Sequence, residues 1–268
     1  MASTSRRVYS YVVAIPEHLT FLGHATVLLE VAGARIITDP VLRPAATFLR
    51  RVPHVADLPG YTDADIVLIS HLHHDHLDLR SLRMLPGDAV VVVPCGARSW
   101  LVRKGFTNVV ELRPEERVTI DGVEVRATFA NHSGKREPFG PTAIAVGYVV
   151  TAGPTVVYFA GDTDIFPAMA SLVPQGELDI ALIPVWGWGP KLGPGHLDPR
   201  RAAKATALLK PRYVVPIHWG TLSPAGMHKL QMSRLHDPPH EFEAAVRELG
   251  IDVQVLVTKP GQRVEFAP

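Results

Sequence analysis

The residues best suited to metal chemistry form one short run, His-Leu-His-His-Asp-His, directly after a predicted strand. Alternate side chains of an extended segment share one face, so His71, His73 and Asp75 can converge on one point. His76 enters from the following turn, whereas His74 has the opposite parity and is left out. Imidazole and carboxylate ligands this close together predict a site for one or two divalent ions. A histidine-rich surface loop is the alternative interpretation.

Three further candidate ligands each lie just beyond a predicted strand. They are His132 after Val123–Phe129, Asp162 after Thr155–Ala160 and His218 after Tyr213–Ile217. The carboxyl ends of strands in open α/β sheets leave a crevice in which ligands collect. Because separate strand ends all deliver metal-binding side chains, we favour a metal site over a chance cluster.

The elements that must position these residues predict a layered α/β fold, with strands interleaved with a few helices. Ala25–Val31 and Ala34–Thr38 have the pattern of a hairpin, and Ile66–Ser70 that of a strand buried on both faces. Asp198 caps a predicted helix that runs to about Leu209. The strands and helices together account for most of the chain.

The ends of the chain and one internal segment have less regular patterns. Residues 1–18 lack periodicity and are predicted to form an N-terminal arm, followed by a single domain over residues 19–268. Residues 40–64 are rich in Pro and Arg and are predicted to form a long loop. Val253–Val257 is predicted to be the last strand.

Composition narrows the classes of function. The chain has 268 residues with 27 Lys and Arg against 26 Asp and Glu, a net charge of +1. This balance gives no reason to expect nucleic acid or an anionic membrane surface as a partner. No apolar run approaches the ~18 residues of a membrane helix, and the N-terminus has no apolar core of a secretory signal. The single cysteine, Cys95, is typical of a reducing, cytoplasmic environment.

The spacing of the metal-binding run and the later residues resembles the metallo-β-lactamase fold superfamily. The shared features are the HxHxDH run, a downstream histidine, a Gly-Asp-Thr and a late His-Trp-Gly. Further segments are similar to the branch of N-acyl-phosphatidylethanolamine phospholipase D and the ascorbate-6-phosphate lactonase-like hydrolases. These segments are Phe21–Glu30, Thr38–Pro40, Gly195–Pro199 and Ile217–Thr221.

The resemblance implies an α/β fold of four layers, an αββα sandwich with two mixed β-sheets flanked by helices. It also implies a dinuclear centre of two divalent ions, commonly Zn²⁺, with Mn²⁺ or Fe as alternatives. By motif, the candidate ligands divide into His71, His73 and His132 for one ion, Asp75, His76 and His218 for the other, and Asp162 as a bridge between them.

Such a centre predicts hydrolysis. Two ions about 3.5–4 Å apart can share a water, lower its pKa toward 7 and present a hydroxide to an ester, lactone or phosphodiester. In the resembled branch a histidine in the context of His196 lies at the active site, so His196 joins Asp75 as a candidate catalytic residue. A superfamily nuclease, a mononuclear iron oxygenase and a non-catalytic metal-binding scaffold are the alternatives. The substrate is expected to be a small molecule or lipid-like, and a homo-oligomer is left open.

Other residues at the same edge could shape the site. Three tryptophans could wall a pocket for an apolar part of the substrate or simply pack there: Trp186, Trp188 and Trp219. Three cations in the loops are interpreted as solvated charges, with contact to a phosphate or carboxylate as the alternative: Lys135, Arg136 and Lys191. His24 is expected to cap or support the site rather than to act in catalysis.

Overall fold

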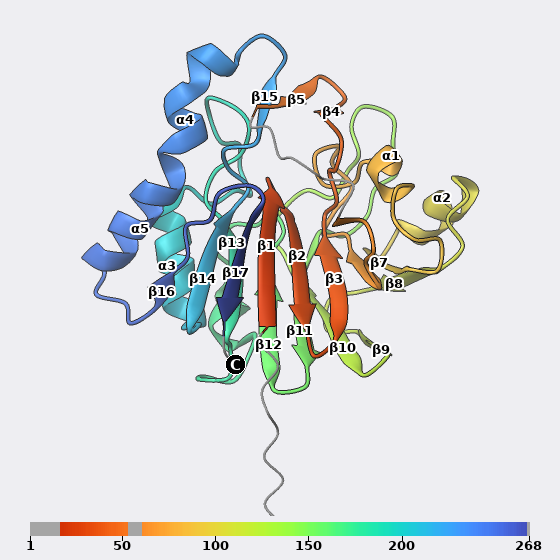
Figure 1. The fold of residues 1–268 in the computed structure, drawn as a ribbon, viewed down its shortest axis with the longest axis horizontal. Helices are drawn as coiled ribbons and strands as arrows, with labels where there is room; N and C mark the ends of the chain where they lie inside the picture. Colours follow the sequence, from red (N-terminus) through yellow and green to blue (C-terminus); the bar gives the residue numbers. More distant parts are fainter. Residues whose placement is uncertain (1–16, 53–60, 267–268) are drawn as a thin grey trace, which may run out of the picture.

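The computed structural model describes residues 17–52 and 61–266, and two seven-stranded sheets form its centre (Figure 1). The first sheet has the order β17–β1–β2–β3–β6–β7–β8. Its strands are β1 (Glu17–Gly23), β2 (Thr26–Val31), β3 (Ala34–Thr38), β6 (Ile66–Leu68), β7 (Val90–Pro94), β8 (Val109–Leu112) and β17 (Gln262–Phe266). Strands from β17 to β3 pair antiparallel, and strands from β3 to β8 pair parallel.

The second sheet repeats this division into an antiparallel and a parallel half. Its order is β16–β14–β13–β12–β11–β10–β9. The strands are β9 (Arg117–Ile120), β10 (Val123–Phe129), β11 (Val146–Ala152), β12 (Thr155–Phe159), β13 (Ile180–Pro184), β14 (Tyr213–Ile217) and β16 (Gln254–Val255). Strands β9 to β12 pair antiparallel, and β12, β13, β14 and β16 pair parallel. The carboxyl ends of β10, β12, β13 and β14 therefore meet at one edge.

Helices cover the outer faces of the two sheets. They are α1 (Leu79–Leu82), α2 (Arg98–Arg103), α3 (Pro199–Leu209), α4 (Met232–His236) and α5 (Pro238–Glu248), with 3₁₀ turns η2 (Pro167–Ser171) and η3 (His228–Gln231). In Figure 1, α1 and α2 lie on one side of the molecule, and α3, α4 and α5 on the other. None of the helices in the described part of the chain is long and apolar enough to cross a bilayer.

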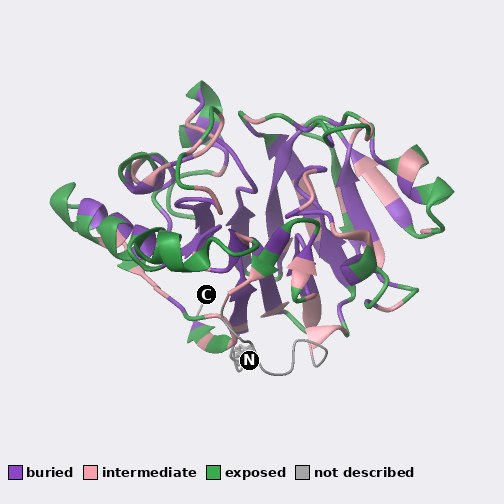
Figure 2. Cartoon of the chain, turned by 90° about the horizontal axis from the view of Figure 1, so that it is seen from above, coloured by how far each residue is buried: buried purple, intermediate pink, exposed green. Residues whose placement is uncertain are grey.

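The main core lies between the sheets. Alternate residues of a strand face opposite sides of its sheet, so one set of side chains fills this core and the other set faces the helices. In β2, Val27 and Leu29 join the core between the sheets, whereas Leu28 joins a second cluster beneath α1 and α2. Figure 2 shows the strands mostly buried and the outer helices exposed on their solvent side. This arrangement confirms the predicted α/β class, with two mixed sheets flanked by helices.

A third, small sheet lies beyond the ends of the large ones, at the top of Figure 1. It has the order β15–β5–β4, built from β4 (Ala45–Ala46), β5 (Leu49–Arg51) and β15 (Leu222–Pro224). The prediction of a loop throughout residues 40–64 is therefore wrong for β4 and β5. Strands of two and three residues are too short to show alternation, and their pairing with β15 depends on chain more than 170 residues away.

Of the remaining sequence predictions, some are confirmed, one is wrong and one lies largely outside the described residues. The hairpin is confirmed as β2 and β3, and the Asp198 carboxylate caps α3 by accepting the Arg201 backbone N–H at 2.8 Å. The predicted last strand is wrong as the end of the fold, because β17 follows it with the polar edge sequence Gln-Arg-Val-Glu-Phe. Residues 1–16 of the predicted arm lie outside the described residues, and residues 17 and 18 already belong to β1.

Candidate metal centre

The histidines and carboxylates singled out in the sequence converge at one edge of the two sheets. His71 follows β6, His132 follows β10, Asp162 follows β12 and His218 follows β14. Because β10, β12 and β14 run in the same direction, their carboxyl ends deliver these side chains to one place. The loop after β6 brings the rest of the His-Leu-His-His-Asp-His run to the same point.

One group of donors consists of three imidazoles from two loops. His71 Nε2 lies 3.0 Å from His73 Nδ1, and His132 Nε2 lies 3.2 Å from the same His73 atom. All three ligand atoms lie within 4.8 Å of one another, close enough to share an ion. The His71 side chain is fully buried and that of His132 is 2% exposed, whereas His73 is partly exposed.

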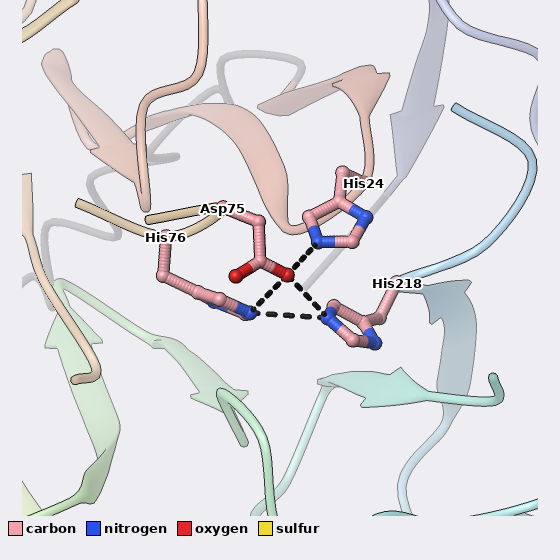
Figure 3. A group of neighbouring side chains, drawn as sticks. All are labelled: His24, Asp75, His76 and His218. Carbon is pink, nitrogen blue, oxygen red and sulfur yellow. Dashed lines mark hydrogen bonds and ion pairs between the residues drawn. The ribbon is translucent and has the colours of Figure 1, made fainter. Parts of the chain in front are cut away.

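A second, fully buried group combines three imidazoles and a carboxylate (Figure 3). His76 Nε2 lies 3.0 Å from His218 Nε2, and Asp75 Oδ2 lies 3.6 Å from each of these nitrogens. His24 Nε2 lies 2.9 Å from Asp75 Oδ2. His24 therefore belongs to the donor group itself, in direct contact with Asp75.

Two members of this second group have left-handed backbones, an uncommon conformation for residues with a side chain. His24 has φ 57° and His218 has φ 61°. The His218 backbone N–H donates to the His24 carbonyl at 2.6 Å, and this hydrogen bond links the backbones of the two residues. Such conformations cost about 1–3 kcal/mol each and persist where the surrounding structure fixes them.

Asp162 lies between the two groups. Its Oδ2 is 3.2 Å from His76 Nε2 and 3.9 Å from both His71 Nε2 and His132 Nε2. Its Oδ1 is 3.3 Å from His218 Nε2, yet this buried oxygen accepts no hydrogen bond from any residue in the described ranges. A buried carboxylate oxygen without a donor is destabilising unless a cation compensates it.

Backbone carbonyls fix two of the imidazole tautomers. His218 Nδ1–H donates to the Trp186 carbonyl at 2.8 Å, and His132 Nδ1–H donates to the Gly195 carbonyl at 2.8 Å. A carbonyl can only accept, so each Nδ1 carries the proton and each Nε2 turns a lone pair toward the centre. Both histidines are thus oriented as metal ligands are.

A buried carboxylate orients two more. Asp39 Oδ2 accepts from His76 Nδ1–H at 2.6 Å and from the Ser70 hydroxyl at 2.5 Å. The Ser70 oxygen in turn accepts from His71 Nδ1–H at 2.9 Å. Asp39 therefore supports one histidine of each donor group, directly in one case and through Ser70 in the other.

These residues fit metal ions. With Nδ1 of His76 and His218 protonated, two Nε2 lone pairs face each other at 3.0 Å, an arrangement that requires a proton or a cation between them. The donor set of imidazole and carboxylate, with no thiolate, suits Zn²⁺, Mn²⁺ or Fe. Three buried carboxylates, Asp39, Asp75 and Asp162, add negative charge that a cation would neutralise.

The pKa values of the donor residues agree with this balance between buried carboxylates and a cation. Burial alone would raise the pKa of Asp162, but the charges of His218 and His76 outweigh it and hold that pKa well below its usual value. Burial and the neighbouring imidazoles lower the pKa of His24 to about 3, so that side chain is neutral. Burial lowers the pKa of His132 to about 4 despite the charge of Asp162.

His196 lies beside the centre on the loop that precedes α3. Its Nε2 is 3.5 Å from Asp162 Oδ2, and its side chain is 23% exposed. Burial would lower the pKa of His196, but the hydrogen bond and charge of Asp162 outweigh it and raise the pKa to about 9. The imidazolium therefore sits between a buried carboxylate and open space.

That open space is a cavity of about 750 Å³. Its floor is formed by His73 of the first donor group, by Asp75 and His218 of the second, and by Asp162, and His196 also lines the cavity. The size lies within the range of about 300–1,000 Å³ that small-molecule sites occupy. The centre is thus open to a small molecule from one side.

The structure decides between the two alternatives left open for the tryptophans. Trp188 lines the cavity, whereas Trp186 and Trp219 are buried outside its lining, and Trp219 stacks on Phe21 at 5.8 Å. The interpretation of Arg136 as a solvated charge is wrong. Its guanidinium is buried and donates to the Leu72 carbonyl at 2.7 Å, because the loop after β6 leaves backbone acceptors without other partners.

Sequence reasoning missed two contributors to the site and one contact of a third. Asp39 lies in the Thr-Asp-Pro segment that carried the resemblance, and its place directly after β3 was the available signal. Phe48, which lines the cavity, sits in the turn between β4 and β5, where the sequence offered no signal. His24 was expected to be a supporting residue, and its direct contact with Asp75 could not be read from its position in the sequence.

Comparisons with known proteins agree with this geometry. The Beta-lactamase superfamily domain matches residues 34–219. A UPF0173 metal-dependent hydrolase of Methanopyrus kandleri is 32% identical over 259 residues, covering 92% of this chain and 99% of the relative. Another, from Thermococcus onnurineus, is 34% identical over 254 residues, covering 92% and 98%.

Solved structures give the same result. Igni18, described as a novel metallo hydrolase from Ignicoccus hospitalis, superposes with a TM-score of 0.71 at 25% identity and covers 94% of this chain and 99% of its own. The match to the superfamily domain spans more than half of the chain, and the relatives match almost all of it. The chain therefore belongs to the beta-lactamase superfamily and, within it, to the UPF0173 metal-dependent hydrolases.

Proposed function

We propose that the protein is a dinuclear metal-dependent hydrolase that cleaves an ester, lactone or phosphodiester. The first ion would be held by His71, His73 and His132, and the second by Asp75, His76 and His218, with Asp162 between the two. Zn²⁺ suits this donor set, and Mn²⁺ or Fe are the alternatives. The proposal rests on one observation above all: Asp162 lies 3.2–3.9 Å from imidazole nitrogens of both donor groups.

Bound ions would supply a water activated at neutral pH and would polarise the substrate oxygen that gains negative charge. The protein's own residues have three tasks. Asp162 and Asp75 provide the negative charge that holds the centre together. Asp39 keeps the imidazoles of His76 and, through Ser70, His71 in the orientation that turns their Nε2 atoms toward the other donors.

His196 is proposed to handle the proton of the leaving group. Its Nε2 faces Asp162 and its ring lines the cavity, so the same atom can turn from the carboxylate to a substrate oxygen. Proton donation from a positioned imidazole typically contributes about 10²–10⁴-fold to the rate. This assigns His196 a role that does not require it to bind metal.

The sequence resemblance to N-acyl-phosphatidylethanolamine phospholipase D and to the ascorbate-6-phosphate lactonase-like hydrolases remains a prediction about the substrate. It would make the protein a phosphodiesterase or a lactonase. Both reactions use the same centre, because each adds water to an electrophilic carbon or phosphorus and releases an alcohol. The metal centre therefore does not distinguish the two substrate classes, and only the residues that line the cavity can do so.

Metal analysis and substrate screening test the proposal together. We expect about two Zn, Mn or Fe ions per chain in the purified protein. After chelation, restoring one of these metals should restore hydrolysis of a p-nitrophenyl ester, a simple lactone or bis-p-nitrophenyl phosphate. One iron per chain, with oxygen consumption and no hydrolysis, would instead favour the oxygenase. Full metal occupancy without turnover of any compound would favour the scaffold.

A further inference from the structure

The cavity has an apolar wall that hydrolysis itself does not require. Apart from the donor groups and Asp162, the lining consists mainly of hydrophobic side chains and glycine-rich backbone. The apolar residues are Phe48, Leu49, Pro138, Trp188, Pro190 and Leu192. Water and two ions would be sufficient for the chemistry, so this wall points to the part of the substrate that does not react.

Two aromatic rings of this wall contact each other. Phe48 comes from the turn between β4 and β5, and Trp188 from the loop after β13. Their ring centroids lie 5.4 Å apart with an interplanar angle of 81°, an edge-to-face contact. Phe48 nevertheless stays 56% exposed. A phenylalanine this exposed, braced by a second ring beside a cavity, offers surface that an apolar ligand would cover.

The charges around the cavity argue against an anionic group bound away from the centre. Lys191 is the only Lys or Arg among the described residues that line it, and its side chain reaches into solvent. Glu137, also in the lining, pairs with Lys135 at 3.0 Å. A phosphate-bearing tail would call for buried cations in the lining, as bidentate arginines commonly supply, but Arg136, the buried arginine next to Glu137, is engaged by backbone carbonyls.

Resting on the hydrolase function proposed above, we propose that the substrate is a neutral carboxylic ester whose acyl chain or aryl group packs against Phe48 and Trp188. The cavity of about 750 Å³ accommodates the whole of such a small molecule. In the reaction, water adds its oxygen to the ester carbonyl and the bond between carbonyl carbon and alkoxy oxygen breaks. The acid and the alcohol are released, with the alcohol taking one proton of the water, so no oxidant or reductant is needed.

A chain-length series tests the packing. The metal-loaded protein is assayed with p-nitrophenyl acetate, butyrate, hexanoate and octanoate, and with bis-p-nitrophenyl phosphate. We expect kcat/KM to rise by up to about fourfold for each methylene that becomes buried, and by at least about tenfold from butyrate to octanoate. A flat series, or turnover of the phosphodiester well above that of every ester, would overturn the proposal.

Single substitutions localise the effect. Phe48→Ala and Trp188→Ala should each lower the octanoate-to-butyrate ratio of kcat/KM by at least about threefold, the loss expected when one methylene or more loses its contact. The matched control is Phe139→Ala, because Phe139 is 98% exposed and lies outside the cavity lining. This control should keep the wild-type ratio. If the octanoate-to-butyrate ratio changed equally in all three variants, the acyl chain would not pack against Phe48 and Trp188, and the proposal would be overturned.

Binding separates this proposal from the proposed function. 2-Nonanone resembles an ester with an apolar chain but cannot be hydrolysed, and its binding is measured by titration calorimetry on the metal-loaded protein. Binding that Phe48→Ala and Trp188→Ala weaken, without turnover of any ester, lactone or phosphodiester, would support the apolar subsite and overturn the hydrolase. Ester turnover with a flat chain-length series and no binding of 2-nonanone would support the hydrolase and overturn the subsite.

Discussion

The floor and the wall of the cavity are built in opposite ways. The floor consists of the two donor groups and Asp162, most of them buried and several tied to a backbone carbonyl or to Asp39. The wall, formed by Phe48, Leu49, Pro138, Trp188, Pro190 and Leu192, belongs to turns, loops and β5, and all of these residues except Leu49 are at least partly exposed. The floor follows strand ends of the two large sheets, whereas the wall comes from loops and the small third sheet.

This difference separates the reaction from the choice of substrate. Residues at the ends of buried strands keep fixed positions, as a charge-dense centre requires, whereas loops can change without disturbing the core. A change in the floor should therefore affect every substrate alike. A change in the wall should alter only the preference among substrates. Substitutions in the floor, in its supports and in the loop that joins it to the wall can test this separation.

Asp162→Ala should have the largest effect, because this carboxylate lies between both donor groups. We expect the metal content to fall from about two ions per chain to below one, and turnover of every substrate to fall to background. Elemental analysis after gel filtration measures the metal content, and the ester assay measures the turnover. The matched control is Asp164→Ala, since Asp164 pairs with Arg201 near the surface. Undiminished metal content in Asp162→Ala would remove Asp162 from the centre.

His196→Ala should retain the metal and lose turnover. The side chain lines the cavity and faces Asp162 at 3.5 Å, without belonging to either of the two main donor groups. We expect kcat to fall by about 10²–10⁴-fold, the usual scale of general acid–base assistance. His240→Ala, at an exposed position on α5, serves as the control. Loss of metal in His196→Ala would identify His196 as a ligand instead.

The floor could be predicted from the sequence because its residues carry chemistry at recognisable places. His71, Asp162 and His218 each follow an apolar run of strand length, and that position alone indicates the sheet edge. Whether they bind metal remains a prediction that the metal analysis tests. Other elements were predictable from their own patterns: β10 alternates, β14 is a continuous apolar run, and α3 begins at a capping aspartate.

The wall could not be predicted, because it depends on pairing between distant segments. Phe48 reaches the cavity only since β5 pairs with β15, and neither short strand has a readable pattern. Arg136 shows the same limit in another form. A lone arginine in a polar loop suggests solvent, and only the folded chain reveals the carbonyl oxygens of Leu72 and Leu77 that it satisfies.

Asp39→Asn tests how the floor is supported. The carboxylate accepts hydrogen bonds from His76 and Ser70, and an amide cannot accept both as strongly or neutralise a bound cation. We expect the affinity for metal to fall by about 10–100-fold, the usual effect of removing such a partner of a ligand. Competition with a metal chelator measures this, with exposed Asp88→Asn as the control. Unchanged affinity in Asp39→Asn would mean that the histidines hold their orientation without it.

Arg136→Met should have the smallest effect, and it tests whether floor and wall are independent. Arg136 links them: its guanidinium donates to the Leu72 and Leu77 carbonyls of the metal-binding loop, and its backbone lies next to the lining residues Glu137 and Pro138. Methionine keeps most of the volume but leaves two carbonyls without a donor, which costs about 1–3 kcal/mol of stability. For a chain of this size that lowers Tm by about 2–10 °C.

Calorimetry measures this change, and Arg113→Met, at an exposed position, should leave Tm unchanged within about 1 °C. The metal content and the ester preference of Arg136→Met then decide whether the floor is independent of the wall. If the wall alone shifts, the metal content stays near two ions per chain and only the preference for long-chain esters declines. If metal is lost as well, the loop after β6 needs Arg136 to keep its shape, and the floor depends on the loops that form the wall.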